Sequence, residues 1–139
     1  MNENKISFIK FLPGLAWFFI VDYSTLMPGK DVPDVGWFYF PQMDKLVHII
    51  LFGGLTLLFC LPYLKTNYSF QKKKNIFIRI SLCIILWGLI IEVIQHFFIP
   101  GRGFEWLDVL ADSVGVLIAY WICLKISQSK NILVRIPFF

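Results

Sequence analysis

Long apolar runs, separated by short polar connections, dominate the sequence. A transmembrane helix needs roughly 17–25 mainly apolar residues. Four segments meet this requirement, at about residues 8–27, 46–64, 76–99 and 107–124. Turn-forming residues separate them, namely Pro28-Gly29, Lys65-Thr66-Asn67 and Pro100-Gly101. The pattern therefore predicts an all-α membrane protein with four transmembrane helices, which form a single domain over residues 1–139.

The composition supports this interpretation. Of the 139 residues, 58% are hydrophobic and only 16% are charged, and the mean hydropathy is +0.70. Soluble globular domains average roughly 45–50% apolar and about 25% charged residues. A small soluble fold has too little interior to bury so much apolar surface. A membrane location is therefore expected.

The basic residues predict the orientation. Ten of the 13 Lys and Arg residues fall at the N-terminus, in the 65–79 connection or in the C-terminal tail, which all lie on one side of the predicted helices. The other three are Lys30, Lys45 and Arg102. Because positively charged connections stay in the cytoplasm, both termini are predicted to be cytoplasmic. The first apolar run has basic Lys5 and Lys10 before it, as a signal peptide has, but no small-x-small site closes it, so an uncleaved helix is expected.

The acidic residues are biased the other way, because eight of the nine fall in the external half. Acids contribute little to insertion topology, so the bias predicts another role. Glu92 precedes Ile99 by seven residues, which places it about 10 Å beneath the external boundary. Gln95 follows Glu92 on the same helix face. In the last apolar run, one stripe consists of acidic and small residues, as on a helix face packed against other helices: Asp108, Asp112, Gly115 and Ala119.

The second apolar run also begins with polar residues, Asp44, Lys45 and His48. An Asp at a helix centre costs about 2.5–3.5 kcal/mol on insertion, so these groups are expected to face the bundle interior and to share a polar pocket that opens outward. Two alternatives remain. Ion pairs can simply hold helices together, and Asp44 and Asp108 can act as helix caps. Three of the remaining external acids are interpreted as solvated loop charges: Asp31, Asp34 and Glu105.

Several familiar sites are absent from the sequence. No Gly-rich phosphate loop precedes a helix, no His-Glu-x-x-His run offers zinc ligands, and no Gly-x-Ser-x-Gly elbow presents a nucleophile. The short run Lys72-Lys73-Lys74 follows a predicted span, so it is interpreted as a topology determinant that touches anionic lipid. No nucleic-acid partner is expected.

The order of the polar motifs resembles that of the VanZ-like family of small bacterial membrane proteins. The matching elements are Asp44-Lys45-x-x-His48, Glu92-x-x-Gln95, Pro100-Gly101-Arg102 and Asp108-x-x-x-Asp112-x-x-Gly115. They cover roughly residues 44–115. The family usually has Asn where this chain has Asp112, which leaves open whether the position acts as an amide or as a carboxylate. The resemblance implies a multi-pass protein of the bacterial cytoplasmic membrane, linked in some members to resistance against teicoplanin, and it supplies no reaction.

These observations lead to a hypothesis for the site. Its function would be to bind or process a cell-envelope lipid or glycan precursor at the outer leaflet. The expected partners are membrane lipids and a lipid-linked cell-wall precursor. The expected acid/base groups are His48, Glu92 and Asp112, and the expected ligand-binding residues are Asp44, Lys45, Gln95, Arg102 and Asp108. Lys45 and Arg102 would hold a phosphate or carboxylate. A divalent cation held by Asp108 and Asp112, with Glu92 or His48, is a further alternative. The competing hypothesis is a non-enzymatic membrane partner that affects envelope composition.

Overall fold

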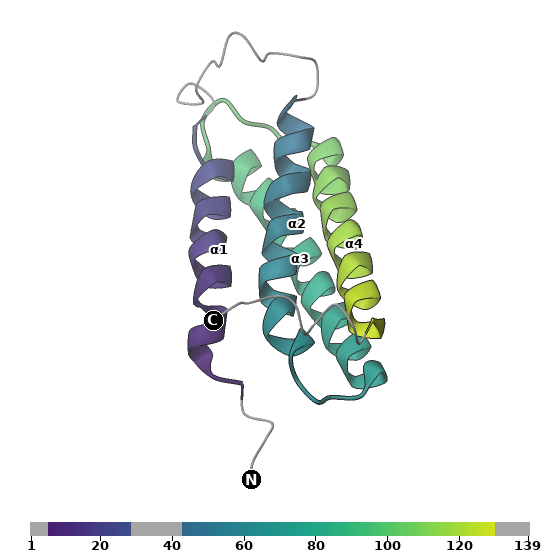
Figure 1. The fold of residues 1–139 in the computed structure, drawn as a ribbon. Helices are drawn as coiled ribbons and strands as arrows, with labels where there is room; N and C mark the ends of the chain where they lie inside the picture. The colour runs from purple at the N-terminus through teal and green to yellow at the C-terminus, as the bar shows by residue number, and fades with distance from the viewer. Residues whose placement is uncertain (1–5, 29–42, 130–139) are drawn as a thin grey trace.

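The part of the chain that the computed structural model describes, residues 6–28 and 43–129, is helical throughout apart from short connections (Figure 1). A short 3-10 helix, η1 (Phe8–Phe11), leads directly into α1 (Leu12–Thr25). The other helices are α2 (Met43–Leu64), α3 (Phe70–Phe98) and α4 (Trp106–Gln128). No strand occurs among these described residues. The all-α prediction is therefore confirmed for them.

The helices do not end where the apolar runs end. α3 begins six residues before the predicted start, because the Ser69 side chain accepts a hydrogen bond from the backbone N–H of Lys72 and caps the helix. α4 continues four residues beyond the predicted end, to Gln128. Hydropathy marks the part of a helix that suits lipid, whereas backbone hydrogen bonding continues into the polar flanks. The predicted limits were therefore too narrow for α2, α3 and α4 and slightly too wide for the first helix.

Within the described part of the chain, three helices are long and apolar enough to cross a membrane. α2, α3 and α4 contain windows with mean hydropathies of 2.0, 2.3 and 1.8. The first helix differs from the prediction, because α1 has only 14 residues, fewer than a bilayer core requires. The apolar run that predicted a fourth span is divided here between η1 and α1, which join end to end.

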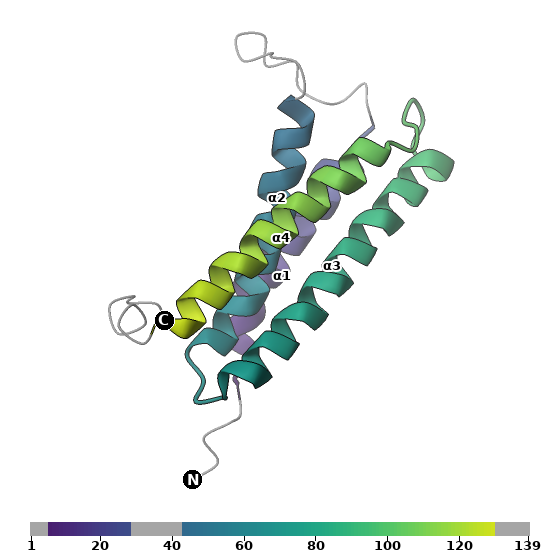
Figure 2. The ribbon, with the colours of Figure 1, turned by 90° about the vertical axis from the view of Figure 1, so that its right-hand side faces the viewer.

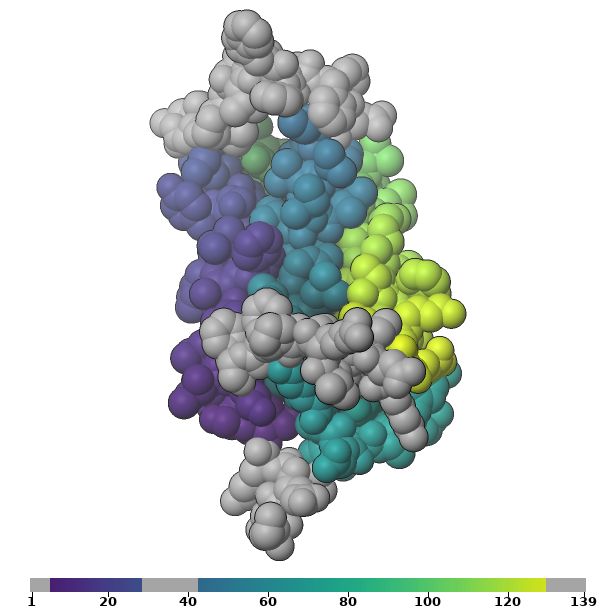
Figure 3. All heavy atoms as spheres, viewed as in Figure 1, coloured from purple at the N-terminus to yellow at the C-terminus, as the bar shows by residue number. Residues whose placement is uncertain are grey.

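The four helices form an antiparallel bundle (Figure 1). We call the end where α1 and α3 finish and where α2 and α4 begin the upper end, as it lies in Figure 1. In the view of Figure 1, α2 lies between α1 and α4, and the space-filling view shows the same order (Figure 3). In the side view α4 crosses in front of α2, and the upper part of α4 lies between α2 and α3 (Figure 2). The upper end therefore brings together polar segments that are far apart in the sequence.

Small residues bring α2 and α4 into backbone contact. A Cβ added at Gly53 would lie 3.1 Å from the carbonyl oxygen of Gly115, and a Cβ at Gly115 would collide with the carbonyl oxygen of Ile49. Ala119, one turn beyond Gly115, is only 1% exposed. Small side chains allow this close approach of helices in a membrane. The predicted packing role of the stripe on α4 is confirmed by this contact.

Apolar side chains fill the interior below the upper end. The side chains that are fully buried between the helices include Phe52, Leu55, Ile91 and Val116. The outward faces carry exposed apolar residues such as Leu86, Leu110 and Leu117. This distribution suits a bundle whose outer surface faces lipid rather than water.

Candidate functional site

Lys45 is the centre of an ion-pair network at the upper end. Its ammonium group donates to the carboxylates of Asp108, of Glu105 at 2.7 Å and of Asp44 at 3.2 Å. The Asp108 side chain is 3% exposed, whereas those of Asp44 and Glu105 are 57% and 59% exposed. The network thus runs from the interior to the surface, and Lys45 joins the first turn of α2 to the first turn of α4.

His48 lies one turn deeper on the same face of α2. Its Nδ1 is 2.8 Å from Oδ1 of Asp112, and its Nε2 is 3.9 Å from Oδ2 of Asp108. All three side chains are almost completely buried. An ionised carboxylate can only accept a hydrogen bond, so a His48–Asp112 bond of this kind places the proton on Nδ1. Nε2 then faces Asp108.

Glu92 brings α3 into the cluster. Its Oε2 accepts a hydrogen bond of 2.9 Å from the backbone N–H of Glu105, while its Oε1 is buried with no hydrogen-bond partner among the described residues. Oδ2 of Asp112 is also buried with no hydrogen-bond partner among the described residues. Buried polar atoms are nearly always hydrogen-bonded in native proteins. Two carboxylate acceptors inside the bundle therefore have no donor among the residues that the structure describes.

The predicted ligand-binding residues Gln95 and Arg102 lie apart from this network. Gln95 is buried, but its amide donates to the carbonyl oxygen of Thr25 at 2.6 Å and so ties α3 to α1. Arg102 is half-buried, and its guanidinium makes no hydrogen bond or ion pair with another described residue. Its position in the connection follows a turn at Gly101, whose φ of 79° is a left-handed conformation that suits glycine.

Two cap assignments and one loop assignment need correction. Asp108 lies in the first turn of α4, but the N-cap position belongs to Glu105, and the Asp108 carboxylate binds Lys45. Asp44 likewise lies inside the first turn of α2. Glu105 was interpreted as a solvated loop charge, yet it contacts both Lys45 and Glu92. Its spacing of three residues from Asp108 is the signal that could have revealed this. Asp31 and Asp34 lie outside the described residues.

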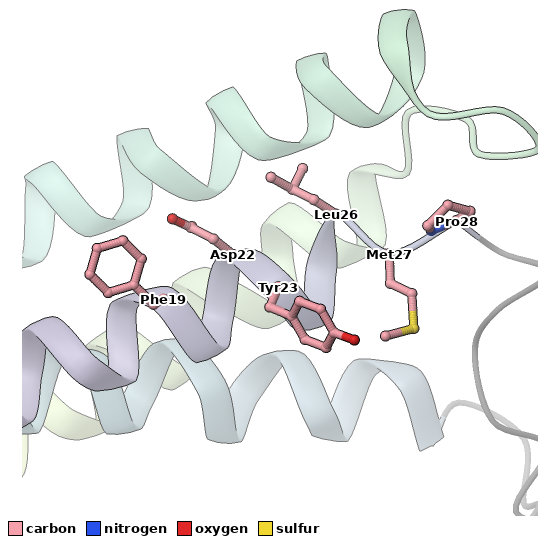
Figure 4. A pocket seen from close by; sticks show the side chains of 6 residues that line it. All are labelled: Phe19, Asp22, Tyr23, Leu26, Met27 and Pro28. Carbon is pink, nitrogen blue, oxygen red and sulfur yellow. The ribbon is translucent and has the colours of Figure 1, made fainter.

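A surface hollow lies beside the end of α1 (Figure 4). It has a volume of about 800 Å³ and is lined by Phe19, Asp22, Tyr23, Leu26, Met27 and Pro28. Asp22 accepts a hydrogen bond of 2.9 Å from the indole N–H of Trp87 on α3. None of the eight predicted site residues lines this hollow. The predicted polar pocket around the buried cluster therefore stays a prediction.

The cluster is rich in negative charge. Asp44, Glu92, Glu105, Asp108 and Asp112 contribute five carboxylates, which face one ammonium group and one imidazole. Such a group of acceptors is suited to hydroxyl or ammonium donors and to metal cations, and less suited to a phosphate. The prediction that Lys45 holds an anion would require Lys45 to leave these three carboxylates.

Gly88 on α3 was not recognised in the sequence, although it lies one turn before Glu92 on the same face. A Cβ at this position would lie 2.7 Å from Oδ2 of Asp112 and 3.1 Å from the Phe52 ring. We expect Gly88→Ala to displace the Asp112 carboxylate and to lower the free energy of unfolding by about 1–3 kcal/mol, the usual cost of overpacking. Thermal unfolding in detergent measures this, and Gly103→Ala is the control, because a Cβ there meets nothing within 4 Å. Equal melting temperatures for the two variants would contradict the packing described.

Comparison with known proteins gives one result. A family model described as VanZ/LLP1 matches residues 5–128, which include all four helices and every residue of the cluster. No curated protein and no solved structure matches the chain.

Proposed function

The chain belongs to the VanZ/LLP1 family, and from that premise we propose that its buried cluster binds the polar headgroup of an envelope lipid or lipid-linked glycan precursor at the extracytoplasmic leaflet. The observation that carries this proposal is the pair of buried acceptors without donors, Oε1 of Glu92 and Oδ2 of Asp112. A cluster that served only to hold helices together would be expected to satisfy its buried polar atoms. Hydroxyl or amino groups of a headgroup would supply the missing donors.

The proposed orientation places the upper end outside the cell. The 65–79 connection, with Lys65, Lys72 and Lys74 at the opposite end, would then be cytoplasmic together with both termini. In this arrangement η1 and α1 act as one span. Their 4 and 14 residues give a combined length of about 29 Å from the rises of the two helix types, close to the hydrocarbon thickness of about 30 Å. The protein would be a multi-pass protein of the bacterial cytoplasmic membrane.

Burial supports a functional role for the charged groups. His48, Glu92, Asp108 and Asp112 are each exposed by 3% or less, and they come from three different helices. Ionisable residues inside a membrane are costly and face the bundle interior, where they mark binding or transfer sites. In the proposed site the carboxylates would accept from the headgroup, and Arg102, which is not paired with any described residue, would meet a phosphate at the membrane surface. His48 and Glu92 would act as acid and base if the ligand is also processed.

A binding assay tests the proposal. The full chain, reconstituted in lipid nanodiscs with a metal chelator present throughout, is titrated with a lipid-linked cell-wall precursor. We expect Glu92→Gln and His48→Ala to weaken binding by about 10- to 100-fold, because each removes a hydrogen bond that involves a charged group. His96→Ala is the matched control, since the His96 side chain is exposed and its ring packs against that of Phe97, outside the cluster. If all three variants bind as the wild type does, the cluster is not the headgroup site.

A second candidate function is a non-enzymatic membrane partner that affects envelope composition. The contacts between helices favour it, because Asp22 bonds Trp87, Gln95 bonds the carbonyl oxygen of Thr25, and Trp17 bonds the carbonyl oxygen of Leu51. These bonds use polar groups to hold α1 against α2 and α3. Co-purification of one stoichiometric membrane protein, unaffected by Glu92→Gln, would favour this function over headgroup binding. A role in glycopeptide resistance would be compatible with either function.

A further inference from the structure

Three side chains at the upper end have the arrangement of a metal site. Asp44 and His48 lie one turn apart on α2, and Asp108 faces them from α4. Each offers one ligand atom, and these atoms all lie within 4.8 Å of one another. Two ligands bonded to one Zn²⁺ at about 2.0–2.2 Å each are separated by no more than about 4.4 Å. Small side-chain adjustments would therefore bring the three atoms to one ion.

The orientation of His48 is independent evidence for a ligand. Its side chain is 4% exposed, and Nδ1 is held at 2.8 Å by the carboxylate of Asp112. Nε2 makes no hydrogen bond with another described residue, and it is directed at Asp108, whose Oδ2 is 3.9 Å away. Metal-binding histidines typically donate their other ring N–H to a carboxylate, which fixes the tautomer and leaves one nitrogen lone pair for the ion. Asp112 holds His48 in this way.

The ammonium group of Lys45 occupies the place of a cation in this arrangement. It contacts two of the metal-site side chains, Asp44 and Asp108, and it also contacts Glu105. The Lys45 side chain is 20% exposed, so its long stem can move the ammonium group out toward the surface. A metal ion and Lys45 would then compete for the same carboxylates.

We propose that Asp44, His48 and Asp108 bind a divalent transition-metal ion, Zn²⁺ in the first instance, with Asp112 as the positioning residue for His48. The imidazole nitrogen selects Zn²⁺ over Ca²⁺ and Mg²⁺, which prefer oxygen ligands only. Three protein ligands leave one position of a tetrahedral Zn²⁺ open. That position would accept water or an oxygen of a headgroup. This inference deepens the proposed function, because it names an ion for the same site.

The test measures Zn²⁺ itself. The purified full chain in detergent is stripped with chelator, and Zn²⁺ binding is followed by calorimetry and by competition with a chromophoric chelator. We expect one saturable Zn²⁺ per chain, lost in His48→Ala and in Asp108→Asn and retained in His96→Ala, which removes the only other histidine. Asp112→Asn is expected to weaken binding by about 10- to 100-fold, as removal of a carboxylate behind a metal-bound histidine does. Absence of saturable binding in the wild type, or equal affinity in His48→Ala, overturns the proposal.

Lys45→Met provides the sharpest comparison. It removes the competing ammonium group and keeps most of the stem, so we expect Zn²⁺ to bind at least tenfold more tightly than to the wild type. An affinity no higher than that of the wild type overturns the proposed competition. Because headgroup binding is measured with chelator present, its outcome is independent of this test. Zn²⁺ binding without headgroup binding, or the reverse, therefore separates the two proposals.

Discussion

Gly115→Ala is expected to disrupt the contact between α2 and α4 and to cause the largest loss of stability of any single methyl addition in the described chain. A Cβ at Gly115 would collide with the backbone carbonyl of Ile49, and its next neighbours are the carbonyl carbon and Cα of the same residue at 3.0 Å. Backbone atoms cannot rotate away as a side chain can. The two helices would have to separate along their closest contact, so the cost should reach or exceed the upper part of the usual overpacking range of about 1–3 kcal/mol.

The measurement is unfolding of the purified protein in mixed micelles with increasing SDS. Gly103→Ala provides the control, because the same methyl group meets nothing within 4 Å there. The separation of α2 and α4 should also disturb the Lys45–Asp108 and His48–Asp112 contacts, which lie between these two helices. A Gly115→Ala variant as stable as Gly103→Ala would show that α2 and α4 do not approach as closely as described.

Lys45→Met is expected to be the next most destabilising change when metal is absent. It leaves the buried carboxylate of Asp108 without its ammonium partner, and Nε2 of His48 is 3.9 Å from that carboxylate. Removal of one partner from a fully buried ion pair costs about 3–5 kcal/mol. Because the Lys45 side chain is 20% exposed, water screens part of this loss, and we expect about 2–4 kcal/mol in SDS unfolding with chelator present.

Asp44→Asn is the matched control for this prediction, since it removes the exposed partner of the same lysine. The Asp44 side chain is 57% exposed, and exposed ion pairs contribute about 1 kcal/mol or less. A difference between the two variants isolates the contribution of burial. If Lys45→Met were no more destabilising than Asp44→Asn, the Lys45–Asp108 pair would not be the central contact of the cluster.

The sequence was sufficient to predict most of the helices, for a clear physical reason. The hydrocarbon core of a bilayer sets a minimum length for an apolar helix, so α2, α3 and α4 were visible as apolar runs bounded by turn residues. Their ends were not visible in the same way. The start of α3 at Phe70 depends on the Ser69 cap and on backbone hydrogen bonds in a polar stretch, which hydropathy does not detect.

The candidate site was predictable only in part. A spacing of four residues placed Asp44 with His48 on α2 and Asp108 with Asp112 on α4. The partner of each group depends on how the helices rotate and cross, which is fixed by the close contact at Gly115. For this reason the pairing of Lys45 with Glu105 was not foreseen. The roles of the eight site residues in binding or catalysis stay predictions.

The contacts between the helices differ in kind, so one part of the bundle is more rigid than the other. α2 and α4 touch through their backbones, so relative sliding of these two helices would break their closest packing. Beyond the close packing of Gly88, the end of α3 near the cluster makes two hydrogen bonds that can open one at a time. Gln95 donates to the carbonyl oxygen of Thr25, and Glu92 accepts from the backbone N–H of Glu105. For the headgroup binding proposed above, we therefore expect a bulky amphiphile to enter sideways from the bilayer, through an outward tilt of the C-terminal end of α3, while α2 and α4 keep their relative positions.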